Sequence, residues 1–247
     1  EPFYRLHFSL DAPLQIHALL FVPKDNLEQH GFGRMEPGVN LYCRKVVIQN
    51  HSHVILPEWL RFLRGVVDSE DLPLNISRET LQDNALVRKL SKVITTRFLK
   101  FLREQMQADR ERYTTFWSNF APFFKEAILG DLAQDYRADL VPLLLFESSK
   151  PEGGRHVSLP EYVSRMKSGQ KSIYYINGPS REAIESGPYI EAFRRRDLEV
   201  LYVYDSIDDF MLTTLHEYEG HPFQSADQGE LDLPDVPAAP DETPPAE

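Results

Sequence analysis

The sequence predicts an α/β protein with two layered subdomains, a larger one first and a smaller one second, joined by a short helical coil and followed by a disordered acidic tail. Three observations lead to this prediction. Strand-like runs open the chain, a long amphipathic helical pattern with many aromatic residues follows, and strand-like and helical runs alternate in the last third. The predicted divisions are residues 1–110, 111–150, 151–223 and 224–247.

The first subdomain is expected to begin with strands. Residues 4–10 alternate apolar and polar side chains, as a half-buried strand does. Residues 15–22 and 40–49 give two further strand-like runs, separated by a loop over residues 24–38 that carries glycines. Pro57 favours a helix start before residues 58–63, and Gly65 would be its C-cap.

The centre of the chain is predicted to be helical. From Arg78 to about Ala108 apolar residues recur at helical spacing, which indicates a long amphipathic helix. Aromatic residues continue from Tyr113 to Phe124, and a run of leucines indicates another helix that ends near Phe146. Together these segments predict the small helical connector.

The second subdomain is expected after residues 147–156, whose serines, proline and glycines are typical of a loop. Ser158 and Glu161 match a capping box, so a helix should run to about Lys167. The later runs alternate in type, which predicts a small sheet with a parallel component and covering helices. They are strands at 171–176 and 199–204, and helices at 180–185, 188–195 and 207–218.

Composition excludes several classes of protein. The net charge is -11, and residues 224–247 hold seven acids, five of the 18 prolines and no Lys or Arg, which predicts a disordered tail or linker. This balance argues against a general nucleic-acid binder, and no apolar run is long enough to span a membrane. The single Cys43 rules out an intramolecular disulfide and favours a reducing compartment such as the cytosol. Because Glu1 adjoins a strand-like run, we expect the chain to be part of a longer protein.

Two motifs resemble catalytic or metal sites, but the sequence around each of them favours another interpretation. His216 and His221 flank Glu217 in a pattern that resembles a zinc signature, but residues five apart lie on different helix faces, so no metal site is predicted. Cys43 precedes Arg44 and Lys45, which would activate an exposed thiol, although a small packed residue is the favoured interpretation.

Three large aromatic residues are candidates for exposed anchors that bind other proteins. Packing in the core is the favoured alternative, because large aromatic side chains are usually buried. The three residues are Trp59, Phe62 and Trp117.

Residues 64–82 place polar groups at the start of the long predicted helix. Arg78 lies in its first turn, where a cation is unfavourable unless an anion binds nearby or the side chain projects away. Gln82 is four residues further on and therefore on the same face. The pattern allows a phosphate contact, and the alternative is a solvated arginine that pairs with Glu70 or Glu79.

The run VVDSEDLPLNISRE from Val66 to Glu79 resembles the signature of the heat-shock protein 90 chaperones. Similar blocks extend the resemblance over about residues 2–223, and their sequences are nearest to those of the bacterial and mitochondrial members. Among them are DAPLQIHALLFVPKDN at 11–26, LYCRKVVI at 41–48, LPEWLRFLRG at 56–65, EYVSRMKSGQKSIYYI at 161–176 and LEVLYVYDSIDD at 198–209.

The resemblance implies the middle segment of such a chaperone, which agrees with the predicted order of subdomains. In that family ATP and Mg²⁺ are bound mainly by an N-terminal domain, and a loop of the middle segment reaches the nucleotide. By motif, Arg78 contacts the γ-phosphate, with Asn75 and Gln82 as further nucleotide contacts, and Arg44 is a weaker candidate near the same phosphates. The general base belongs to the N-terminal domain, so we expect this segment alone to be inactive.

The resemblance also implies partners. They are the N-terminal ATPase domain and the C-terminal dimerisation domain of the same chain, unfolded or partly folded client proteins, and a second copy in a homodimer, without nucleic acid or membrane. No residue is assigned to client binding. The expected location is the cytoplasm of a bacterium, with the mitochondrial matrix as the alternative. The alternative function is a non-hydrolytic protein-binding or structural module of the same fold.

Overall fold

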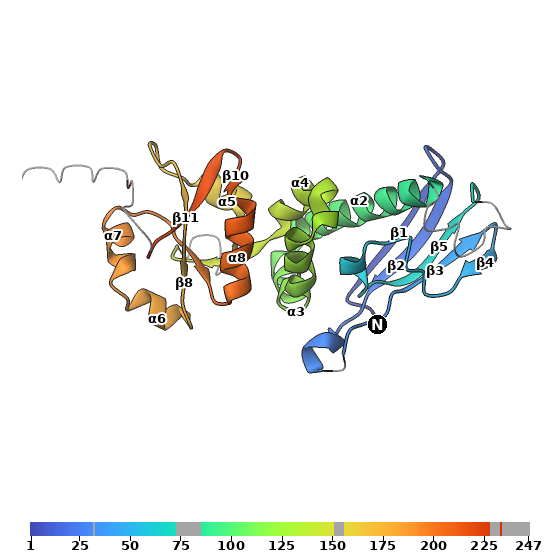
Figure 1. Ribbon diagram of the computed structural model, residues 1–247, viewed down its shortest axis with the longest axis horizontal. Helices are drawn as coiled ribbons and strands as arrows, with labels where there is room; N and C mark the ends of the chain where they lie inside the picture. Colours follow the sequence, from blue (N-terminus) through green and yellow to red (C-terminus); the bar gives the residue numbers. More distant parts are fainter. Residues whose placement is uncertain (32, 73–84, 151–155, 228–232, 234–247) are drawn as a thin grey trace, which may run out of the picture. The chain divides into compact units, whose positions relative to one another are not determined.

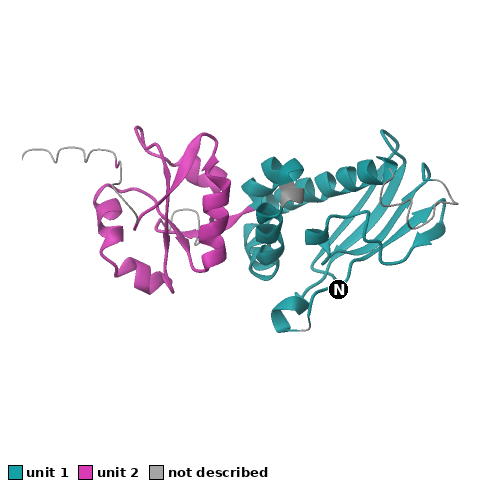
Figure 2. Ribbon diagram, viewed as in Figure 1, with its two compact units in different colours: residues 1–143 teal, residues 144–247 magenta. Residues whose placement is uncertain are grey.

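The chain folds as two compact units, Glu1–Leu143 (unit 1) and Leu144–Glu247 (unit 2), coloured separately in Figure 2. The computed structural model describes residues 1–31, 33–72, 85–150, 156–227 and 233. Each unit contains a sheet with helices, so the mixed α/β class is confirmed and the layout in two parts is compatible with the prediction. The separate helical coil stays a prediction, and residues 228–232 and 234–247 of the predicted tail lie outside the described residues.

Unit 1 is built on a mixed sheet with the strand order β1-β2-β5-β3-β4 (Figure 1). The strands are β1 (Tyr4–Leu10), β2 (Ile16–Val22), β3 (Gly38–Cys43), β4 (Val46–Gln49) and β5 (Arg64–Ser69). β2 pairs antiparallel with both β1 and β5, whereas β3 runs parallel to β5. The first two predicted strands are confirmed.

The prediction of one strand over residues 40–49 is wrong. The chain reverses at Arg44 and Lys45, whose φ angles are 50° and 66°, so that β3 and β4 form an antiparallel hairpin. A two-residue turn with positive φ at both positions normally contains Gly or Asn, and neither residue is present in this turn. The loop before β3 also contains a short 3₁₀ helix, η1 (Leu27–His30).

The helix predicted at residues 58–63 is a single 3₁₀ turn, η2 (Glu58–Leu60), and Gly65 is not its C-cap. Gly65 instead lies in β5 with a φ of 138°. A Cβ atom there would lie 2.1 Å from the carbonyl oxygen of Leu19 on β2. Glycine is therefore required by the close approach of two backbones, a constraint that local sequence does not reveal.

Two long helices cover the inner face of this sheet, as ring contacts between Tyr4 of β1 and Phe101 and Phe116 of the helices indicate. They are α2 (Ala85–Ala108) and α3 (Arg110–Leu129). The predicted long helix is confirmed over residues 85–108, and its predicted start at Arg78 lies outside the described residues. Three short helical turns follow, η3 (Asp131–Tyr136), α4 (Arg137–Leu140) and η4 (Val141–Leu143).

The core of unit 1 is a cluster of aromatic rings around Phe62. Its ring centroid lies 4.8 Å from that of Phe120 and 4.9 Å from that of Phe123. Phe62 is fully buried, and Trp59 and Trp117 are only 4% and 6% exposed. Because burying one such side chain contributes about 1.5–3 kcal/mol, these residues stabilise the fold. The core interpretation of all three is confirmed, and they are not exposed anchors.

Unit 2 contains a second mixed sheet with the order β10-β11-β8-β9-β6-β7. Its strands are β6 (Leu145–Ser148), β7 (His156–Ser158), β8 (Ile173–Asn177), β9 (Leu201–Val203), β10 (Glu217–Tyr218) and β11 (His221–Ser225). Its helices are α5 (Leu159–Ser164), α6 (Arg181–Glu185), α7 (Tyr189–Arg195) and α8 (Ser206–Leu215). β8 is parallel to β9 and to β11, so the predicted parallel component is confirmed.

Several predicted boundaries in unit 2 are corrected. The capping box of Ser158 and Glu161 is present, but α5 ends at Ser164 rather than near Lys167. The helix predicted over the leucine run is present as the short turns α4 and η4, but it ends at Leu143, and β6 begins at Leu145 where helix was expected up to Phe146. A short apolar run fits a buried strand and a buried helix equally well, which is why sequence periodicity missed this strand. Within the described residues, no helix has the length and apolar character required to cross a membrane.

Candidate functional site

Three connections of unit 1 gather at one edge of the sheet. Because β3 and β5 are parallel, their carboxyl ends lie together, with Tyr42 opposite Asp68. β2 runs the other way and begins here, with Ile16 opposite Ser69. This edge, which we call the β3–β5 edge, therefore carries the Arg44–Lys45 turn and the chain that leaves β5 (Figure 1). Polar groups that follow the carboxyl ends of parallel strands often form ligand sites.

Three of the four predicted site residues lie in the segment after β5. Asn75, Arg78 and Gln82 are outside the described residues, so their predicted roles are not tested here. The chain leading into that segment is well anchored, because Leu72 is 4% exposed and its carbonyl accepts a hydrogen bond from Cys43 Sγ at 2.8 Å. The segment therefore departs from the same edge that carries Arg44.

Arg44 occupies an unusual backbone conformation. Both it and Lys45 are left-handed without being glycine, which costs roughly 1–2 kcal/mol for each residue. The backbone N–H of Lys45 donates to Asp68 Oδ2 at 2.9 Å, which ties the turn to β5. Both side chains are exposed and, among the described residues, neither forms a hydrogen bond or an ion pair. The turn thus presents two cations to an incoming anion.

Cys43 is a packed residue of this edge and not an exposed thiol. It is fully buried. Burial raises the pKa of its thiol, Arg44 opposes that shift, and the carboxylates of Asp68, Glu70 and Asp71 reinforce it. The thiol is therefore protonated at neutral pH, which confirms the packed interpretation and excludes an activated nucleophile.

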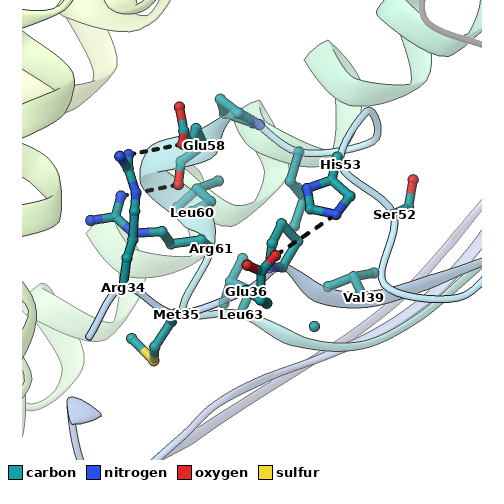
Figure 3. A pocket seen from close by; sticks show the side chains of 14 residues that line it. Arg34, Met35, Glu36, Val39, Ser52, His53, Glu58, Leu60, Arg61 and Leu63 are labelled. Carbon is teal, nitrogen blue, oxygen red and sulfur yellow. Dashed lines mark hydrogen bonds and ion pairs between the residues drawn. The ribbon is translucent and has the colours of Figure 1, made fainter. Parts of the chain in front are cut away.

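A cavity of about 580 Å³ lies at the opposite end of β3 and β5 (Figure 3). Its wall includes the buried apolar residues Val39, Leu60 and Leu63. Its arginines are already engaged: Arg34 pairs with Glu58 at 2.9 Å and with Glu126 at 3.0 Å. Arg61 pairs with Glu28 and Glu126, both at 2.8 Å. The charges around the cavity therefore satisfy one another and do not define a specific ligand.

The histidine pair that resembles a zinc signature is split between elements. α8 ends at Leu215, His216 follows with a φ of 60°, and His221 begins β11. His221 Nδ1 lies 3.0 Å from the backbone oxygen of Lys171. Among the described residues, no cluster of three His, Cys, Asp or Glu side chains could hold a metal ion.

Unit 2 exposes an apolar surface that sequence inspection did not identify. Ile207 and Phe210 of α8 are 40% and 62% exposed, and residues three apart lie on one face of a helix. Met211 and Leu215 of the same helix are buried in the core. Helical periodicity predicted the helix, but apolar residues cover a wide arc of α8, so the pattern did not show which of them were exposed. Exposed apolar residues that adjoin one another are typical of protein-binding surfaces.

The fold and these two surfaces define a protein of two α/β units that offers cations at a sheet edge and apolar side chains on an exposed helix. The family model described as Hsp90 protein matches residues 1–243. The chain therefore belongs to the heat-shock protein 90 family.

Individual relatives agree with this family. The chain is 56% identical over 235 residues to chaperone protein HtpG of Desulfitobacterium hafniense (strain Y51), covering 95% of this chain and 38% of that protein. It is 57% identical over 233 residues to HtpG of Desulfotalea psychrophila (strain LSv54 / DSM 12343), covering 94% and 37%. It is 44% identical over 234 residues to the mitochondrial TNF receptor-associated protein 1 homolog of Dictyostelium discoideum, covering 94% and 33%. The chain thus spans about a third of the length of these relatives.

Proposed function

We propose that this chain is the middle segment of an ATP-dependent molecular chaperone and supplies the γ-phosphate-contacting arginine, Arg78, to an N-terminal ATPase domain. The observation that carries the proposal is the run from Val66 to Glu79, which begins in β5 and continues from the β3–β5 edge. Membership of the heat-shock protein 90 family supports it. The Arg44–Lys45 turn, which Asp68 ties to β5, presents two cations at the same edge.

In the proposed reaction the γ-phosphoryl group of ATP is transferred to water, giving ADP and phosphate. ATP and Mg²⁺ are held mainly by the N-terminal domain, which also provides the general base. The planar guanidinium of Arg78 stabilises charge on the phosphoryl oxygens during transfer, and a lysine could not reproduce its two parallel hydrogen bonds. Asn75, Gln82 and Arg44 are further nucleotide contacts in this proposal.

The second part of the proposed function is client binding. Ile207 and Phe210 offer an exposed apolar surface to which an unfolded or partly folded protein could bind. The full-length protein is proposed to form a homodimer through a C-terminal domain. Its location is proposed to be the cytoplasm of a bacterium, or the mitochondrial matrix if the source is eukaryotic.

The test of the hydrolytic role is Arg78→Ala in the full-length protein. Loss of the arginine should lower the ATPase kcat by about 10³-fold or more, because an arginine that contacts the transferred phosphoryl group contributes on that order. ATP binding, measured by calorimetry, should change little, because the nucleotide pocket is in the other domain. Arg88→Ala on α2 is the matched control, since it removes a cation of unit 1 outside the predicted motif.

Two results would contradict the proposal. Unchanged turnover in Arg78→Ala would favour the alternative, a non-hydrolytic protein-binding module of the same fold. ATP binding or hydrolysis by the 247-residue chain alone would show that it carries its own nucleotide site, since the proposed role requires the N-terminal domain.

A further inference from the structure

The geometry of the β3–β5 edge points to a further residue that serves the proposed ATPase site. We propose that Asp68 is a positioning residue: its carboxylate holds the β3–β4 turn in the left-handed conformation that presents Arg44 to the nucleotide phosphates. This inference rests on the proposed function, because Arg44 has a phosphate to contact only when the nucleotide-binding domain docks at this edge. Asp68 itself does not contact the nucleotide.

The turn requires an external support. Arg44 and Lys45 have φ angles of 50° and 66°, although each carries a full side chain. Two-residue hairpin turns with positive φ at both positions normally use Asn-Gly or a similar pair. Because the two residues here do not favour this conformation, the surrounding structure must impose it. The hydrogen bond from Lys45 N–H to Asp68 Oδ2, at 2.9 Å, is a contact that does so.

The position of Asp68 suits this task. Asp68 lies on β5 directly opposite Tyr42 of β3, and these two strands are parallel. Tyr42 in turn precedes Arg44 by two residues. A carboxylate on the neighbouring strand can therefore reach the turn that follows β3. The accepted bond joins a charged acceptor to a backbone donor, and such bonds are about twice as strong as neutral ones.

The other oxygen of the Asp68 carboxylate is unfavourable for the stability of the edge. This oxygen, Oδ1, is buried and, among the described residues, has no hydrogen-bond partner. Burying such an oxygen without a partner is unfavourable. Asp68 thus combines an unfavourable buried oxygen with two strained neighbours, Arg44 and Lys45, whose side chains have no partner among the described residues. Such a pattern is expected where structure is held for function.

Asp71 provides a matched control at the same edge. Its Oδ2 accepts a hydrogen bond from the backbone N–H of Gln15 at 2.7 Å, so it also joins a carboxylate to a neighbouring turn. That turn precedes β2 and does not carry Arg44. Removing Asp71 should perturb the edge to a similar degree without releasing the Arg44–Lys45 turn.

The experiment compares four variants in the full-length protein: Arg44→Ala, Asp68→Ala, Asp68→Asn and Asp71→Ala. Arg44→Ala and Asp68→Ala should each lower kcat by about tenfold while the dissociation constant for ATP changes less than about threefold. Asp68→Asn keeps an oxygen that can accept from Lys45 N–H and should recover at least half of the turnover. Asp71→Ala should stay within about twofold of the wild type.

A second measurement follows the turn itself. In the 247-residue chain, hydrogen exchange at the Lys45 amide should accelerate at least tenfold in Asp68→Ala and remain slow in Asp68→Asn and Asp71→Ala. Exchange at core amides of β5, measured in the same variant, gives the contribution of global unfolding. Faster exchange at Lys45 beyond that contribution reports loss of the proposed contact even in a less stable variant.

The outcomes separate the two proposals. If Arg44→Ala turns over ATP normally, the proposed nucleotide contact of Arg44 fails, and the role of Asp68 fails with it. If Arg44→Ala is impaired while Asp68→Ala has normal turnover, only the positioning role is refuted. It is also refuted if Lys45 exchange does not change in Asp68→Ala, or if Asp71→Ala impairs kcat as strongly as Asp68→Ala.

Discussion

At the scale of single residues, Arg61 of unit 1 is a buried charge with several partners. It is 6% exposed, donates to both oxygens of Glu28 at 2.8 and 3.0 Å, and donates to Glu126. Its guanidinium carbon lies 4.6 Å from the centroid of the Phe123 ring. Burial would lower the pKa of Arg61, but its hydrogen bonds to the two carboxylates raise the pKa above the ordinary value. Arg61 therefore joins the η1 loop and α3 to the aromatic core.

Glu28 makes this cluster sensitive to acid. Burial would raise the pKa of Glu28, but hydrogen bonds from Arg61 and from the backbone N–H of Met35 lower it below its usual 4.5. A carboxylate with a lowered folded-state pKa contributes stability that is present above the unfolded value. That contribution is lost as pH falls below 4.5 and through the lower folded-state value.

Glu28→Gln should therefore reduce the free energy of unfolding by about 1.5–3 kcal/mol at neutral pH, the range for hydrogen bonds to charged groups. The difference from the wild type should shrink as pH falls below 4.5, because the wild-type carboxylate then becomes protonated. Urea unfolding at several pH values measures both quantities. Glu36→Gln is the control, since the Glu36 side chain is 82% exposed and lies 3.9 Å from His53. A constant difference across this pH range would contradict the prediction.

Residue roles were only partly predictable from sequence. Burial of Trp59 and Phe62 followed from their chemistry, because large apolar rings are favoured inside. The contact between Asp68 and Lys45 was not predictable, because it depends on the parallel pairing of two strands about 25 residues apart in the chain. The left-handed turn also lacked the glycine or asparagine that would have marked it.

At the scale of elements, sequence periodicity worked where an element was long or had two different faces. It predicted α2 over its described length and the alternating strand β1. It failed for β6, β10 and β11, which are two to five residues long and contain too few positions to show a period. It also identified α8 without showing that one apolar face lies outside the core.

That exposed face of α8 carries the prediction for client binding. Phe210→Ser in the full-length protein should weaken binding of an unfolded model client by about tenfold, because removal of a central aromatic contact typically costs 1–2 kcal/mol or more. Fluorescence anisotropy with a labelled, permanently unfolded protein measures the affinity. Tyr189→Ser on α7 is the control, since Tyr189 is also exposed, at 52%, but lies on another helix. Equal losses of affinity in both variants would indicate nonspecific binding to exposed apolar residues instead of a defined client-binding surface.

At the scale of the whole molecule, each unit has its own core. Unit 1 is organised around the rings that contact Phe62, and unit 2 has a separate cluster that includes Tyr174, Phe193 and Tyr202. The sequence predicted that the second part begins at residue 151, because serines, a proline and glycines mark a loop there. The chain divides instead between Leu143 and Leu144, so that β6 belongs to unit 2.

The place of β6 in its sheet leads to a test of this division. β6 lies between β9 and β7 and pairs with both, and the Ser149 N–H donates to the Val200 carbonyl at 2.9 Å. A fragment of residues 144–247 should therefore unfold cooperatively in urea, whereas a fragment of residues 151–247 loses an interior strand and should be largely unfolded or aggregated. Circular dichroism and urea titration distinguish these results. If the shorter fragment were as stable as the longer one, β6 would not be required by unit 2, and the boundary expected from the loop residues would be the better description.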